Sequence, residues 1–325
     1  MSEKASSADG IGRRNFLGGC AAAALTSADA AKVWSTGSHG LIHATAARRT
    51  MPLNRGSLFG GKLHPGATAP AFNAAAFARI DLPHTVAPLS WQKWNPAAWE
   101  DVWIYRRHFS LPPAWRGLRL FAYCERVMTG ATLVINDHVL EQHLGGFLPF
   151  EREITGLTRE NDNVLAIEVD SRWLNVPPSG SPRGPVAVDY LMPGGITGAV
   201  TLRAMPKTLI REVYAKPVSV LSSDPRVEIL CRIDASGHLP VRARLRTVLK
   251  KHDRIISTVS HSSQIERPDE EIRFTMDRLS GIQLWAVEHP QLYLLEATLF
   301  LDERPLHSYS TPVGFREECF ELNGF

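Results

Sequence analysis

The sequence lacks the features that mark several classes of protein. It contains no Cys-x-x-Cys pair, so we predict no metal site, and we expect no cofactor. No run of lysine or arginine stands out and the formal net charge is only +3, which argues against nucleic acid as a partner. Beyond the N-terminus, no segment approaches the ~20 apolar residues that a membrane-spanning helix needs.

The chain also lacks a convincing amphipathic helix. Its 24 glycines and 22 prolines are spread along the chain, which suits many short strands joined by turns. An apolar fraction of 44% and a charged fraction of 21% are typical of globular proteins, and 325 residues give room for about two domains. The expected fold class is therefore all-β.

Residues 1–30 have the pattern of a twin-arginine export signal. Arg13-Arg14 is followed by an alanine-rich stretch from Phe16 to about Thr26, and Ala28-Asp29-Ala30 is a small-x-small cleavage site. This order favours export over a disordered tail with a chance arginine pair, and over a lipoprotein modified at Cys20. The mature protein is expected to be soluble and periplasmic or secreted, with residues 31–54 as a flexible leader.

Residues 55–206 are predicted to form a first domain of short strands. In Asn163–Asp170 the apolar residues alternate cleanly, and Asn136-Asp137 is typical of a hairpin turn. Two antiparallel sheets packed face to face would bury such strands. Strands are expected at Phe77–Leu82, Asp101–Ser110, Leu118–Ala122, Ala131–Ile135, Val139–Leu144, Asn163–Asp170 and Val200–Ala204.

The pattern of residues 207–315 predicts a second domain of about seven strands. This strand number and domain length are typical of an immunoglobulin-type sandwich. It ends in a hairpin of Leu292–Leu301 and Leu306–Val313. In Val241–Arg246, three arginines alternate with apolar residues. We interpret them as a solvated face, in preference to a surface for nucleic acid or an acidic polysaccharide.

Loss of the signal would leave Cys124, Cys231 and Cys319, an odd number scattered along the chain. Cys231 alternates with apolar residues, so we expect an inert core residue.

Several phrases of the sequence resemble one family. IDLPHT, WIYRRHFSLP, ATLVINDHVLEQHLGGFLPFEREIT, ENDNVLAIEVDSRW and MPGGI, followed by LWAVEHPQLYLLE and VGFREECFELNG, occur in this order. They are similar to the N-terminal part of glycoside hydrolase family 2, which contains β-galactosidases, β-glucuronidases and β-mannosidases. The resemblance implies a galactose-binding-like jelly roll and then an immunoglobulin-like sandwich. Residues 316–325 would begin the link to a catalytic (β/α)8 barrel, which is absent from this chain.

We assign no catalytic residue. Hydrolysis of a glycosidic bond needs two carboxyl groups across the sugar, and the family carries both on the barrel, one of them in an Asn-Glu dipeptide. The chain has no Asn-Glu dipeptide. It also has Thr197-Gly198 where the family usually has an aromatic residue and arginine, and an unusually proline- and glycine-rich loop at Val176–Val188.

Carbohydrate binding is the remaining activity. Trp91, Trp94 and Trp99 lie in one expected loop and form a candidate stacking platform, although we favour a structural role for these rings. The resemblance adds Asp170, Arg172 and Asn175, which occupy the position of a loop that reaches the active site in some family members.

The leading hypothesis is a non-catalytic, exported portion of a family 2 enzyme that is inactive alone. One alternative is a subunit that docks with a separately encoded barrel. The other is a stand-alone carbohydrate-binding protein.

Overall fold

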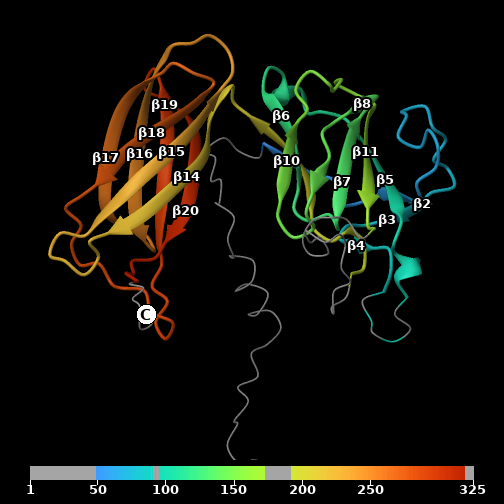
Figure 1. Ribbon diagram of the computed structural model, residues 1–325. Helices are drawn as coiled ribbons and strands as arrows, with labels where there is room; N and C mark the ends of the chain where they lie inside the picture. Colours follow the sequence, from blue (N-terminus) through green and yellow to red (C-terminus); the bar gives the residue numbers. More distant parts are fainter. Residues whose placement is uncertain (1–48, 89, 91, 93–94, 173–191, 319–325) are drawn as a thin grey trace, which may run out of the picture. The chain divides into compact units, whose positions relative to one another are not determined.

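The computed structural model describes residues 49–318, apart from 89, 91, 93–94 and 173–191. In these residues two β-sandwiches follow one another along the chain (Figure 1), and the only helical turns are η1 (Pro96–Ala98) and η2 (Pro113–Trp115). This confirms the all-β fold class. The predicted signal peptide and most of the predicted leader lie outside the described residues. No helix in the described part of the chain is long and apolar enough to cross a membrane.

The first sandwich consists of two antiparallel sheets. One has the strand order β1-β13-β6-β10, and the other has the order β3-β2-β5-β11-β7-β8, with β9 also paired to β7. A short ribbon joins β4 and β12. The bounds are β1 (Thr50–Pro52), β2 (Ser57–Lys62), β3 (Ala78–Ile80), β4 (His84–Thr85), β5 (Val102–Phe109), β6 (Arg119–Cys124), β7 (Gly130–Ile135), β8 (His138–Val139), β9 (His143–Leu144), β10 (Phe150–Glu153), β11 (Asn163–Asp170), β12 (Gly195–Ile196) and β13 (Val200–Met205).

Strand β11 lies in the middle of the larger sheet and pairs with β5 along its whole length and with β7 along most of it. The predicted alternation is confirmed, because Leu165, Ile167 and Val169 all belong to the main core of the sandwich. The opposite face is also covered, since Ala166 packs in a smaller cluster beneath Phe72 and Phe77. Both faces of β11 are therefore buried.

The segment that covers this outer face is held by a buried arginine. Arg106 on β5 is only 1% exposed, and its guanidinium donates to the carbonyl oxygens of Ala67, Ala69 and Pro70, the last two at 2.9 and 3.4 Å. Its charge also lies 5.7 Å from the centre of the Phe72 ring. Burial lowers the pKa of Arg106, and three carbonyl oxygens solvate the charge in place of water.

The first sandwich begins earlier than the predicted residue 55. Thr50–Pro52 form β1, which pairs with β13, and Leu53 is 2% exposed. The predicted leader at 31–54 therefore extends too far at its C-terminal end. The predicted hairpin at Asn136-Asp137 is confirmed, with Asn136 at a φ of 54° and Ile135 opposite His138.

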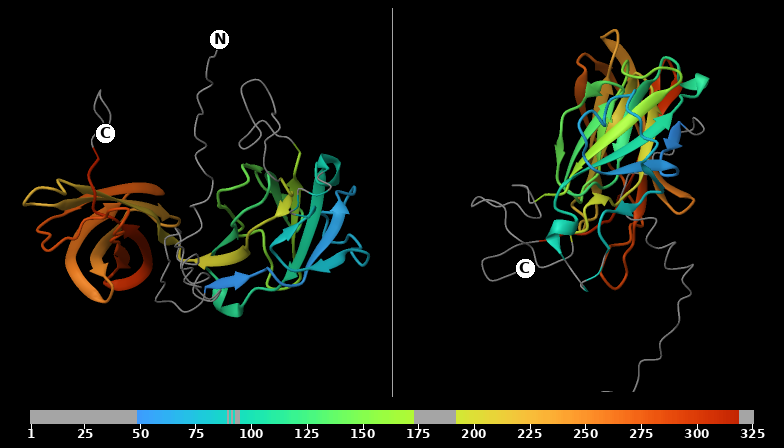
Figure 2. Two further views of the ribbon diagram at one scale, coloured as in Figure 1. Left: turned by 90° about the horizontal axis from the view of Figure 1, so that it is seen from below. Right: turned by 90° about the vertical axis from the view of Figure 1, so that its right-hand side faces the viewer.

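The second sandwich contains seven strands, as predicted. One sheet has the order β14-β15-β18 and the other β17-β16-β19-β20. Figure 2 (left) looks along these strands, which curve around the core. The bounds are β14 (Thr208–Val218), β15 (Arg226–Ala235), β16 (Val241–Lys251), β17 (Arg254–Ile265), β18 (Asp269–Met276), β19 (Tyr293–Leu301) and β20 (Arg304–Val313).

Period-two burial explains why these strands form. In β15 the inward residues Val227, Ile229, Cys231 and Ile233 are each at most 2% exposed. Burial raises the pKa of the Cys231 thiol to about 12, so the prediction of an inert core cysteine is confirmed. The arginines of β16 lie on its outer face, as predicted.

His307 provides a test of this packing. It lies on β20, is 5% exposed, and its Nδ1 accepts a hydrogen bond from the Ile210 N–H at 3.2 Å. Burial lowers its pKa to about 4 from 6.5, so the folded protein holds a neutral imidazole. The unfolded chain binds the proton first as pH falls, so stability from this group is present above pH 6.5 and is lost toward pH 4.

We expect the free energy of unfolding to fall by about 3 kcal/mol more in the native protein than in His307→Gln between pH 7.5 and 4. Chemical denaturation at several pH values measures this difference. Because other acids titrate equally in both proteins, parallel pH profiles would show that His307 is not buried as a neutral ring.

Candidate functional site

The first predicted binding residues lie at the C-terminal end of β11. Asp170 is 7% exposed, and its Oδ1 accepts from the backbone N–H of Arg172 at 3.1 Å and from Nε at 2.9 Å. Its Oδ2 accepts from Nη2 of Arg172 at 2.6 Å. The aspartate raises the pKa of Arg172, whose side chain is 57% exposed. The structure therefore brings these two candidates together as a bidentate ion pair.

A second ion pair lies at the neighbouring start of β5. Lys62 Nζ is 2.6 Å from Asp101 Oδ2, and this hydrogen bond, with one from the Val102 N–H, lowers the pKa of Asp101. The backbone N–H of Ser171 donates to the Asp101 carbonyl oxygen at 2.9 Å, which ties the two strand ends together. Both carboxylates at this edge thus have a cation of their own.

The candidate tryptophans are only partly described. Trp99 is 0% exposed and packs with Ala87, Met128 and Met192, while its carbonyl oxygen accepts from Trp103 Nε1 at 2.9 Å. A sugar needs an open ring face for stacking, so this burial favours the structural role for Trp99. Trp91, Trp94 and Asn175, together with the loop at 176–188, lie outside the described residues.

Local geometry accounts for Thr197-Gly198. The N–H groups of both residues donate to the Arg126 carbonyl oxygen, at 3.1 and 3.2 Å. A Cβ at position 198 would lie 2.7 Å from the Arg126 backbone nitrogen, closer than real contacts allow. The arginine side chain that the family usually carries at the position of Gly198 does not fit this arrangement.

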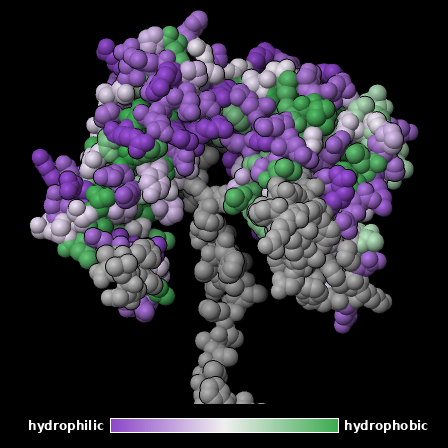
Figure 3. All heavy atoms as spheres, viewed as in Figure 1, coloured by the Kyte–Doolittle hydropathy of each residue, from purple (hydrophilic) through white to green (hydrophobic). Residues whose placement is uncertain are grey.

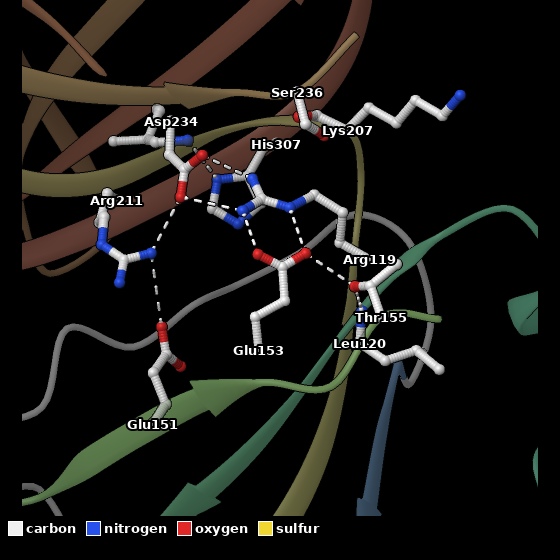
Figure 4. A network of polar contacts seen from close by, with 11 residues as sticks. Arg119, Leu120, Glu151, Glu153, Thr155, Lys207, Arg211, Asp234, Ser236 and His307 are labelled. Atoms are coloured by element: carbon white, nitrogen blue, oxygen red, sulfur yellow. Dashed lines mark hydrogen bonds and ion pairs between the residues drawn. The ribbon is translucent and has the colours of Figure 1, made fainter. Parts of the chain in front are cut away.

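A further polar network, which the sequence did not predict, surrounds Arg119 (Figure 4). Arg119 is 8% exposed and donates to both oxygens of Glu153, at 3.0 and 2.7 Å. It also donates to both oxygens of Asp234, at 2.6 and 3.2 Å. Arg211 approaches the same Asp234 at 2.9 Å, and Thr155 donates to Glu153 at 2.7 Å. Arg119, Glu153 and Asp234 are thus each held by more than one polar contact.

The described carboxylates at these sites are poorly suited to acid catalysis. The hydrogen bond from Arg119 lowers the pKa of Glu153, whereas a general acid in glycoside hydrolysis needs a raised pKa. Burial does raise the pKa of Glu168 on β11. The Glu168 side chain forms no hydrogen bond or ion pair with any residue in the described part of the chain, and burial is the cause of this shift. Glu153, with its lowered pKa, is therefore a poor candidate for the acid of a catalytic pair.

The Arg119 network can be tested by breaking it. Arg119→Leu would leave the Glu153 carboxylate without a cation and Asp234 with Arg211 alone, and we expect the free energy of unfolding to fall by about 3 kcal/mol. The matched control is Arg116→Leu, because the Arg116–Glu160 pair is 77% and 71% exposed and should change stability by less than about 1 kcal/mol. Equal losses in guanidinium denaturation would contradict a special role for the buried pair.

Comparison with known proteins places this geometry in a family. The model of the glycosyl hydrolase 2 galactose-binding domain-like module matches residues 88–206. The model of glycosyl hydrolases family 2 matches residues 208–316, so the two cover most of the chain. The chain belongs to glycoside hydrolase family 2. This confirms the resemblance found in the sequence.

Individual relatives agree with this assignment. A β-galactosidase of Thermoanaerobacter pseudethanolicus is 27% identical over 256 residues, covering 78% of this chain and 33% of its own length. The β-galactosidase large subunit of Lactobacillus acidophilus is 26% identical over 202 residues, covering 60% of this chain and 29% of its own length. A structure of Bacteroides uniformis β-glucuronidase 2, covalently bound to cyclophellitol-6-carboxylate aziridine, has a TM-score of 0.72 at 22% identity, covering 84% and 33%. The chain thus spans about a third of the length of these proteins.

Proposed function

We propose that this chain is a non-catalytic N-terminal portion of a family 2 glycoside hydrolase and is inactive alone. The family activity would be hydrolysis of the O-glycosyl bonds of β-glycosides. The observation that carries the proposal is the ion pairing of the carboxylates at the candidate site, since Asp101 binds Lys62 and Asp170 binds Arg172. The match to about a third of each relative supports it.

The test is an assay of the purified chain on nitrophenyl β-galactoside and nitrophenyl β-glucuronide. We expect release of nitrophenol at the rate of a heat-denatured sample of the same preparation. The double variant Asp170→Asn, Asp101→Asn serves as the control. Activity from a contaminating hydrolase would be the same in preparations of the native chain and of this variant. Turnover above background that this variant abolishes would overturn the proposal of inactivity.

A second candidate is a subunit that completes an enzyme by docking with a separately encoded catalytic barrel. The name of the Lactobacillus acidophilus relative, a large subunit, favours this because it indicates an enzyme made of more than one chain. Co-purification of the tagged chain from its native cells would identify such a barrel, and hydrolysis should appear only when both chains are mixed.

We further propose export through the twin-arginine route, on the basis of Arg13-Arg14 and the alanine-rich stretch after it. Export receptors read such signals as addresses, and arginine and lysine differ in the hydrogen bonds that they present. We therefore expect Arg13→Lys, Arg14→Lys to retain the precursor inside the cell with its charge unchanged. Fractionation and immunoblotting measure this, with Arg49→Lys as the matched control. Equal export of all three proteins would exclude the route.

A further inference from the structure

An open cavity of about 610 Å³ lies at one end of the first sandwich. One wall is the connection from β5 to β6 at residues 111–118, and the other is the connection from β10 to β11 at residues 155–161. Leu111, Pro112, Leu118 and Leu120 give the cavity a mainly apolar lining. Figure 3 shows a hydrophobic patch at the upper end of this sandwich, near the labels of β6 and β8 in Figure 1. The volume lies within the ~300–1,000 Å³ of small-molecule sites.

The walls of this cavity are fixed before any ligand binds. Asn163 is 0% exposed and clamps Arg159, since its Oδ1 accepts from the Arg159 N–H and its Nδ2 donates to the Arg159 carbonyl oxygen, both at 2.7 Å. The Leu111 N–H donates to the Glu160 carbonyl oxygen at 2.8 Å, which joins one wall to the other. A preformed cavity binds with little loss of conformational entropy.

Some charged side chains around the cavity are ion-paired and others are not. Arg116 pairs with Glu160, and Arg119 pairs with Glu153, which neutralises both acids. The side chains of Arg159 and Lys207 form no ion pair or hydrogen bond with any residue that the structure describes. Figure 4 shows the Lys207 side chain extending away from the Arg119 network. An apolar cavity therefore has two available cations at its edge.

We propose that this cavity binds an amphipathic organic anion, namely an aromatic or alicyclic carboxylate. The ring would pack on Leu118 and Pro112, and the carboxylate would meet Arg159, a charge-assisted contact strengthened by the apolar surroundings. A sugar ring fits the site poorly, because Trp115, the aromatic residue of the lining, is 6% exposed and offers no open face for stacking. This binding activity goes beyond the function proposed above and does not depend on it.

Isothermal titration calorimetry with the full chain tests the proposal, using 2-naphthoate as the probe. We expect binding that weakens about tenfold in Arg159→Gln, which removes one charge-assisted hydrogen bond. The control Arg79→Gln removes an exposed arginine from β3 of the same sandwich and should leave the affinity unchanged. The neutral 2-naphthalenemethanol and the polar glucuronate should each bind at least tenfold more weakly than 2-naphthoate.

Thr158→Trp provides a second variant, since its ring would fill the cavity and should abolish binding. Circular dichroism establishes that the variants are folded. The proposal is overturned by an absence of heat with 2-naphthoate, by equal affinity for the neutral alcohol, or by unchanged affinity in folded Arg159→Gln. Retained binding in folded Thr158→Trp would place the ligand elsewhere and would also overturn it.

Discussion

The pairing of β11 with β5 and β7 positions both ends of the first sandwich. Because side chains alternate across a strand, a slip of one residue would move Leu165, Ile167 and Val169 out of the core. The same register places Asn163 at one end, where it clamps Arg159. At the other end it places Asp170 beside the start of β5, where it binds Arg172. One buried strand thus fixes the cavity wall and the predicted carbohydrate edge.

The sequence predicted the strands that carry their own pattern. The strands of the second sandwich are each at least eight residues long, and both their number and the final hairpin were predicted. The strands that were missed are short or polar. In β10, three of the four residues of Phe150–Glu153 are charged, and this segment is a strand because β6 pairs with it. Pairing across the fold is not visible in a local pattern.

The candidate site shows the same limit. Asp170 and Arg172 are two residues apart, so their ion pair is a contact within one short segment of the chain. Trp99 was assigned to a loop, and composition alone did not show that its ring is fully buried. Arg119 and Asp234 are 115 positions apart, and nothing in either strand's pattern indicates that they meet. Contacts of this kind follow from how the sheets fold, which sequence periodicity does not determine.

Unpaired surface arginines are common in this chain, so the surroundings of Arg159 matter more than its charge. Arg79 on β3 and Arg246 on β16 are exposed side chains surrounded by water, where a bound anion would gain little. Arg159 has its backbone held by a buried asparagine and lies beside an apolar cavity. An anion bound there keeps its charge near the guanidinium while its apolar part leaves water. The favourable free energies of the charge-assisted contact and of apolar burial then add. An unpaired cation whose backbone is held in place next to an apolar surface, where two connections of the sandwich meet, distinguishes this site from a solvated charge.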